Sequence, residues 1–271
     1  MLRALFANRF LLRSMVVRDL RGRYAGSAMG LAWTVIHPIV LLALYTFVFG
    51  FVLRIRANPV VDPLKEPWGG SETLTFTLYL LCGLLPWLAF QESVLRAQTS
   101  VVESANLIKK MPFPSEILPV TVTLTAFLHF LAALALYTLF AASVGSLTLW
   151  PFVYLPLVLV LQLAFSLGLA FLACAGFVYF RDLGHILGLL LHAWFYLTPI
   201  VYPPNLVPAW IQPVFRFNPM HHLMKMYRAI FFHQSAPPGR SLIAFTLAAL
   251  VCCWVGAKVF ASTKRGFADV V

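Results

Sequence analysis

Six apolar segments, each about as long as a bilayer is thick, most strongly limit how this chain can fold. A helix needs roughly 20 apolar residues to cross the hydrocarbon of a membrane. The segments cover residues 30–53, 74–92, 117–142, 150–179, 185–202 and 241–261. Only 11% of the residues are charged, whereas soluble domains carry roughly 25%. The sequence therefore predicts an all-α integral membrane protein with six transmembrane helices in one domain, 1–271, and it excludes a soluble enzyme.

The distribution of basic residues indicates the orientation of these segments. Of the 20 Lys and Arg residues, 13 lie in segments on the side of the two chain ends, and 7 lie on the other side. Lys and Arg collect on the cytoplasmic side of membrane proteins. We therefore expect both termini in the cytoplasm, and we read the net charge of +11 as a topology signal and not as a nucleic-acid-binding surface.

The N-terminal segment, 1–29, predicts an amphipathic helix at the membrane interface. It holds six Arg residues, whose long stems can lie along apolar surface while the guanidinium reaches the headgroups. The segment is either a topology anchor or a platform that also contacts a cytoplasmic partner or an anionic lipid headgroup. Gly22, Gly26 and Gly30 repeat every four residues, which suits either close helix packing or a flexible entrance to the first span.

A short amphipathic helix is predicted in the connection 93–116, on the cytoplasmic face. Val94, Val101 and Ile108 fall on one helical face, and Lys109 and Lys110 stand at the end where cations suit the helix dipole. Composition alone favours a membrane-surface helix, and the alternative is a docking helix for a motor protein. Arg181 and Asp182 form the only charged pair between the fourth and fifth segments and are typical of a cytoplasmic turn.

Residues 203–240 are too apolar for an ordinary loop and contain too many prolines for a span. Asn218-Pro219 predicts a helix start, because Asn is a good cap and Pro at the first helical position loses no needed donor. We expect a short helix over 219–232 within a re-entrant or interfacial hairpin, 203–232, on the outer side. Its two adjacent histidines are His221 and His222.

Few residues have the spacing that catalysis or metal binding needs. No paired carboxylates, H-E-x-x-H motif or cysteine pair with metal-ligand spacing occurs, so we expect no metal and no catalytic residue. The absence of a G-x-x-x-x-G-K-[ST] motif means that any ATP-driven transport needs a separate motor subunit. Trp33, His37 and Tyr45 lie near one face of the first segment, where they either pack the helix or line a path for sugars.

Four stretches resemble one family of membrane proteins. They are RDLRGRYAGS at 18–27 with GLAW and HP after it, KKMPFP at 109–114, NPM at 218–220 and YR at 227–228. The chain resembles the ABC-2 type permeases over nearly its whole length, and more narrowly the polysaccharide exporters that move lipid-linked O-antigen. The first stretch is fairly specific for the family and much less so for the polymer carried.

The resemblance implies a homodimer in the bacterial inner membrane that binds two copies of an ATPase subunit. ATP and Mg would sit on that partner, so this chain would be a transport subunit without cofactor or enzymatic activity of its own. Its cargo would be a polyprenyl-diphosphate-linked polysaccharide. The implied roles are motor coupling for Glu103, Lys109, Lys110, Arg181 and Asp182; a diphosphate entrance for Arg18, Arg21 and Arg23; a glycan path for Trp33, His37 and Tyr45; and an outer gate for Asn218, Pro219, His221 and His222.

Three other functions stay open from the sequence. An ABC-2 exporter of capsule, teichoic acid or a drug differs only in cargo. A membrane-embedded transferase needs a clustered acid or histidine site, and an ion-coupled carrier or channel needs charges in the middle of its spans.

Overall fold

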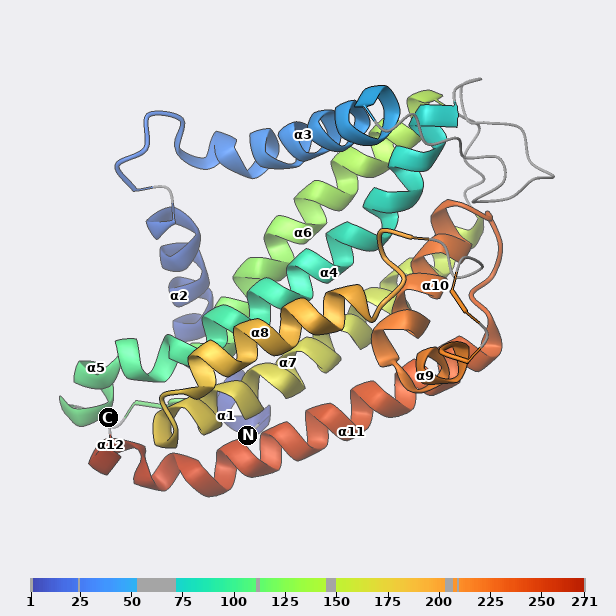
Figure 1. The fold of residues 1–271 in the computed structure, drawn as a ribbon. Coiled ribbons are helices and arrows are strands. Elements are labelled where there is room, and N and C mark those ends of the chain that lie inside the picture. The colour runs from blue at the N-terminus through green and yellow to red at the C-terminus, as the bar shows by residue number, and fades with distance from the viewer. Residues whose placement is uncertain are drawn as a thin grey trace.

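The computed structural model describes residues 2–23, 25–52, 72–110, 113–144, 150–202, 207–208 and 210–270, and contains no strand among them. Long helices lie side by side and run between two ends of the molecule (Figure 1). They are α4 (Glu72–Glu103), α6 (Ile117–Val144), α7 (Leu155–Tyr179) and α11 (Gly239–Thr263). Residues 54–73 and 143–149, which connect predicted segments, fall largely outside the described residues, as do 203–206 of the predicted hairpin.

Four helical stretches are long and apolar enough to cross a membrane. They are Leu74–Glu103, Ile117–Ser143, Phe152–Tyr179 and Gly239–Gly266, and they match four of the six predicted segments. The other two segments form shorter apolar helices, α3 (Trp33–Tyr45), which continues into the π-helical η2 (Thr46–Val52), and α8 (Leu183–Tyr196). The all-helical membrane architecture is thus confirmed, whereas the count of six spans stays a prediction.

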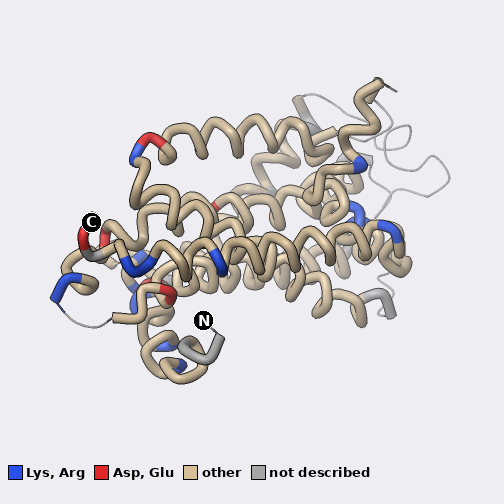
Figure 2. Tube along the Cα trace, turned by 90° about the horizontal axis from the view of Figure 1, so that it is seen from below, with Lys and Arg blue, Asp and Glu red and all other residues tan. Residues whose placement is uncertain are grey.

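Short elements occupy the two ends of the bundle. One end carries α1 (Leu2–Ala7), α2 (Arg9–Gly22), α5 (Ala105–Lys110), η6 (Lys264–Gly266) and α12 (Phe267–Val270), and the other carries η4 (Trp150–Tyr154), α9 (Gln212–Phe217) and α10 (Pro219–Phe231). Lys and Arg gather toward these ends, and most of the chain between them carries no charge (Figure 2). This distribution suits a membrane around the middle of the bundle.

The boundary between the second segment and the cytoplasmic helix differs from the one predicted. Instead of a separate helix over 93–116, α4 continues without a break to Glu103, and α5 follows after a turn at Ser104. Val94 and Val101 are only 2% and 0% exposed, because this part of α4 still packs against neighbouring helices. Continued burial therefore keeps the helix intact, and only Ala105–Lys110 forms a separate element.

Helices α7 and α11 approach each other unusually closely. A Cβ atom added to Gly256 would lie 2.1 Å from the carbonyl oxygen of Gly168, so no larger residue fits there without displacement. Small residues at such positions let two helix backbones meet and gain packing contacts. The contact fixes α11 against the centre of the bundle.

Helix α10 begins where the sequence predicted. The Asn218 side chain accepts a hydrogen bond from the Met220 backbone N–H at 3.0 Å, and Pro219 occupies the first turn. All α10 residues except Pro219 and Lys225 are buried, and the helix packs against α4, α7 and α11. Protein thus covers this helix on nearly all sides.

Candidate functional site

Three adjoining cavities follow the N-terminal helix α2 and share its arginines. The surface cavity, of about 670 Å³, is lined by Arg18, Arg21 and neighbours on α2. The polar cavity, of about 560 Å³, shares Arg18 with it and also contains Arg96 and Glu103. The apolar cavity, of about 330 Å³, shares Arg23 with the polar one and is walled by α3, α4 and α6. Each of the three predicted entrance arginines therefore lines a cavity.

The turn after α2 places Arg23 between these cavities. Gly26 and Gly30 have φ values of +82° and +48°, a conformation that glycine adopts at little cost. A Cβ atom added to Gly22, Gly26 or Gly30 would meet nothing within 4 Å. Within the described part of this chain, the glycines therefore serve a turn into α3 and bring no two of its helix backbones together.

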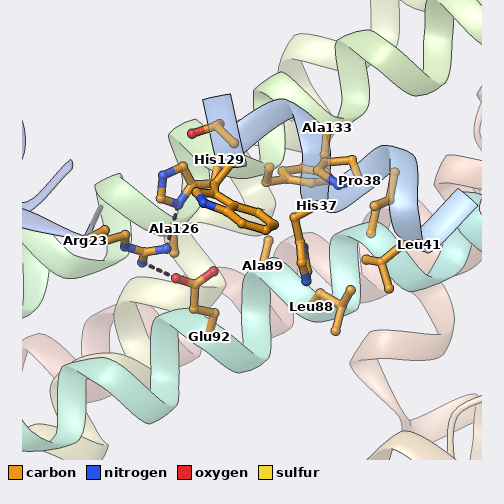
Figure 3. Close-up of a pocket in the computed structure, with 14 residues that line it drawn as sticks. Arg23, His37, Pro38, Leu41, Leu88, Ala89, Glu92, Ala126, His129 and Ala133 are labelled. Carbon is orange, nitrogen blue, oxygen red and sulfur yellow. Dashed lines mark hydrogen bonds and ion pairs between the residues drawn. The ribbon is translucent and has the colours of Figure 1, made fainter. Parts of the chain in front are cut away.

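Arg23 is the centre of a charge network that joins α2, α4 and α6. Its guanidinium donates to the Glu92 carboxylate and lies 2.6 Å from Nδ1 of His129 (Figure 3). Arg96 donates to Asp19 at 2.8 Å and lies 3.7 Å from Glu92, one turn away on α4. Two guanidinium groups thus face two carboxylates in a partly buried setting, where such pairs are stronger than at an open surface.

The network leaves hydrogen-bonding capacity unused. Within the described part of the chain, Nε of Arg23, Nη1 of Arg96 and Oδ2 of Asp19 are buried and have no hydrogen-bond partner. Arginine presents five N–H donors in a fixed fork that matches carboxylates and phosphates. An anion that reaches these two guanidinium groups would therefore find further donors there.

Two of the three predicted path residues meet in the apolar cavity. Trp33 and His37 line it, and the Trp33 indole N–H donates to the Ser27 hydroxyl at 2.9 Å. Tyr45 does not line this cavity and packs against the main apolar core instead. The cavity therefore combines ring surface from α3 with the charges of Arg23 and Glu92 (Figure 3).

Glu92 and His129 are not among the site residues predicted from the sequence. Glu92 is the last residue of the predicted segment 74–92, and His129 lies within the predicted segment 117–142. The available signal was the rarity of ionisable residues in apolar helices, which marks such residues as functional candidates. Nothing in the local sequence indicated that both would face Arg23.

The predicted coupling residues lie at one end of the bundle. Lys109 and Lys110 are exposed at the end of α5, and Glu103 lines the polar cavity. Arg181 and Asp182 are exposed in the turn between α7 and α8, at the same end as α5 (Figure 1).

The predicted gate residues are held by specific contacts at the other end. Asn218 accepts from the Trp194 indole at 2.9 Å and donates to the Thr198 hydroxyl at 2.9 Å. The His222 ring lies 3.2 Å from the Ser241 hydroxyl, and the His221 ring stacks on Phe215.

A buried arginine near these residues also joins α10 to α4. Arg228, 4% exposed, donates to the carbonyl of Ile200 at 2.9 Å and lies 3.9 Å from the centre of the Tyr79 ring. The aromatic face and the carbonyl together compensate a charge that burial would otherwise disfavour.

Comparison with known proteins gives a consistent result. The chain is 31% identical to the O-antigen export system permease protein RfbA of Myxococcus xanthus, over 100% of this chain and 99% of the relative. It is 26% identical to RfbA of Klebsiella pneumoniae, over 94% and 92% of the two chains, and 21% identical to the polysialic acid transport protein KpsM of Escherichia coli, over 93% of each. A family model described as ABC-2 type transporter matches residues 11–232. With its apolar helical bundle and near full-length relatives, the chain belongs to the ABC-2 type transporter family.

Proposed function

We propose that this chain is the permease subunit of an ATP-driven exporter that moves a polyprenyl-diphosphate-linked polysaccharide, similar to O-antigen, across the bacterial inner membrane. The observation that carries the proposal is the row of cavities along α2, which leads from Arg18 and Arg21 at the surface to Arg23 at the apolar cavity. The names of the full-length relatives support a polysaccharide as the cargo.

The arginines supply what a diphosphate needs. Each guanidinium can hold two phosphate oxygens at once. Several arginines in a row let the head group pass from one to the next, so it never has to leave a single tight site. Trp33 and His37 then offer ring surface and polar atoms to the sugars that follow. Many weak contacts of this kind suit a long polymer, because each contact is broken and remade as the polysaccharide slides.

The motor for this movement is a separate ATPase subunit that carries ATP and Mg. We infer two copies of it, bound to two copies of this chain, with both termini of the chain in the cytoplasm and six spans in each copy. Exposed Lys109 and Lys110 on α5, and exposed Glu103 at the end of α4, support α5 as the docking element. The turn with Arg181 and Asp182 lies at the same end of the bundle. Domain motion in the ATPase would reach the membrane through the continuous helix α4.

The outer gate is assigned to the segment 203–232. Asn218 and Pro219 start α10, and contacts of Asn218, His221 and His222 hold this helix to its neighbours. A shift of α10 would therefore open the end of the bundle opposite the ATPase. Burial of α10 supports a re-entrant position, because irregular backbone within a membrane must be covered by protein.

Co-expression with the neighbouring candidate ATPase tests the proposal. We expect a stable complex of two and two copies, whose ATPase activity and export of lipid-linked glycan into inverted vesicles both require the catalytic residue of the partner. A folded, dimeric chain that binds no ATPase would overturn the proposal. Mass spectrometry of the exported glycan would separate O-antigen-like cargo from capsule, teichoic acid or drug.

A double substitution tests the assignment of the docking element. Lys109→Ala with Lys110→Ala removes two exposed charges from the end of α5. We expect stimulation of the partner's ATPase activity by this chain, and export, each to fall at least about tenfold. This is the effect expected from the loss of a few charge-assisted contacts. Arg240→Ala, an exposed cation at the other end, is the matched control. Unchanged stimulation and export in the double variant would rule out α5 as the coupling element.

A further inference from the structure

The arginine that links the polar and apolar cavities is already occupied by a carboxylate of the same chain. Arg23 is 18% exposed at its side chain and donates to Glu92, which is 32% exposed. With Arg96 and Asp19 included, the network contains two cations and two anions. An incoming anion therefore meets no unpaired positive charge in this network and has to compete with Glu92 for Arg23.

We propose that Glu92 is an internal stand-in for the phosphate of the cargo: a phosphate or diphosphate ester entering from the polar cavity displaces the Glu92 carboxylate from Arg23. This inference rests on the proposed function and explains how the entrance selects a diphosphate over smaller or weaker anions. A weak or small anion does not displace a carboxylate held at short range. A diphosphate brings more charge and more acceptor oxygens, and so it wins the exchange.

The surroundings of Arg23 can receive such a group. Nε of Arg23 is buried and has no hydrogen-bond partner among the described residues, and His129 lies on the other side of the guanidinium. The apolar cavity has a volume of about 330 Å³, within the range of roughly 300–1,000 Å³ of small-molecule sites. Head group and adjoining atoms therefore have room beside Arg23.

The displaced carboxylate also has a place to go. Arg96 lies four residues after Glu92 on α4, and their charged atoms are 3.7 Å apart. Glu92 can therefore turn from Arg23 toward Arg96 without becoming an unpaired buried charge, which would be costly. Asp19 on α2 holds Arg96 in position for this exchange at 2.8 Å.

A merely structural role for Glu92 predicts the opposite effect of its removal. If the Arg23–Glu92 pair only fixed α2 to α4, the loss of the carboxylate would loosen Arg23 and weaken anion binding. If Glu92 competes with the cargo, its loss strengthens binding. Glu92→Gln separates the two roles, because the amide keeps the size and one acceptor oxygen and removes the charge.

The experiment uses the complex of this chain with its ATPase partner, held in lipid nanodiscs. Binding of a polyprenyl diphosphate and of inorganic pyrophosphate is titrated for the wild type, Glu92→Gln and Glu116→Gln. Glu116 is the matched control, since it is a buried carboxylate paired with Lys264 at 3.2 Å and lines none of the three cavities. We expect Glu92→Gln to bind the polyprenyl diphosphate about tenfold more tightly, and Glu116→Gln to bind like the wild type.

The remaining outcomes are also decisive. Equal or weaker binding by Glu92→Gln, with a wild type that binds, overturns the exchange and leaves the proposed function standing. No binding by any variant overturns both. Adding Arg23→Gln to Glu92→Gln should abolish the gain, and a gain that persists would overturn the role of Arg23. If Glu92→Gln binds only the polyprenyl diphosphate more tightly, the site recognises a lipid-attached head group. If it binds both probes more tightly, the site recognises the diphosphate itself. Either result supports the exchange.

Discussion

Asn218 is a single residue that joins the end of α8 to the start of α10. Its side chain caps α10 through the Met220 N–H and also bonds Trp194 and Thr198. Asn218→Ala removes all of these bonds and leaves buried donors unpaired, so we expect unfolding to become easier by about 2–4 kcal/mol. Thermal unfolding in detergent measures the change. Asn218→Ser keeps only the cap, so its stability should lie between those of the wild type and Asn218→Ala. An alanine variant as stable as the wild type would contradict the prediction.

We expect His221 to make the same region sensitive to acid. Burial lowers its pKa from 6.5 to about 3, with smaller contributions from Lys225, His222 and Arg228. The folded protein therefore holds the ring neutral. Its contribution to stability is complete above pH 6.5 and declines as the pH falls toward 3, because protons then favour the unfolded chain. We expect a loss of about 2 kcal/mol between pH 7.5 and pH 5. Between pH 7.5 and pH 5, the unfolding midpoint should fall less in His221→Asn than in the wild type. An identical pH dependence of the two proteins would contradict the lowered pKa of His221.

At the scale of whole elements, the contact between α7 and α11 depends on two glycines. Gly256→Ala would place a methyl group 2.1 Å from the backbone oxygen of Gly168, and backbone cannot move aside as a side chain can. We expect a destabilisation of about 3 kcal/mol, seen as a lower unfolding midpoint. Gly188→Ala in α8 is the matched control, since nothing lies within 4 Å of its added Cβ, and it should be neutral or stabilising by up to about 1 kcal/mol. Equal effects of the two substitutions would mean that α7 and α11 do not pack this closely.

At the scale of the whole molecule, α1 and α12 meet α5, the proposed coupling element, in one apolar cluster. Phe267 in α12 is fully buried against Phe260, and Leu5 and Ile108 pack on the same cluster. Phe267→Ala should cost about 3–5 kcal/mol and release α5. Thermal unfolding and the rate of trypsin cleavage after Lys110 measure the two effects. Val270→Ala, at a site 45% exposed, is the control. Cleavage as slow as in the wild type would show that α12 does not restrain α5.

Much of this protein follows from local sequence. Apolar runs of membrane length are enough to predict the four long helices, because each such run must satisfy its backbone hydrogen bonds within itself. The start of α10 was equally predictable, since a cap acts only on residues next to it. The motifs from residue 18 onward gave the family that the comparisons confirm. The roles of the entrance arginines and the coupling lysines followed from the family resemblance, and they stay predictions.

Only the tertiary structure decided which charges face each other. Arg23 meets Glu92 and His129, which are 69 and 106 residues away, and Arg96 meets Asp19 across 77 residues. Tyr45, close to Trp33 and His37 in sequence, packs elsewhere. Helical periodicity fixes which residues share a face of one helix, but it does not fix which helices become neighbours or how far each is rotated. Those choices depend on the packing of the whole bundle, and the pairing of Arg23 with Glu92 is their consequence.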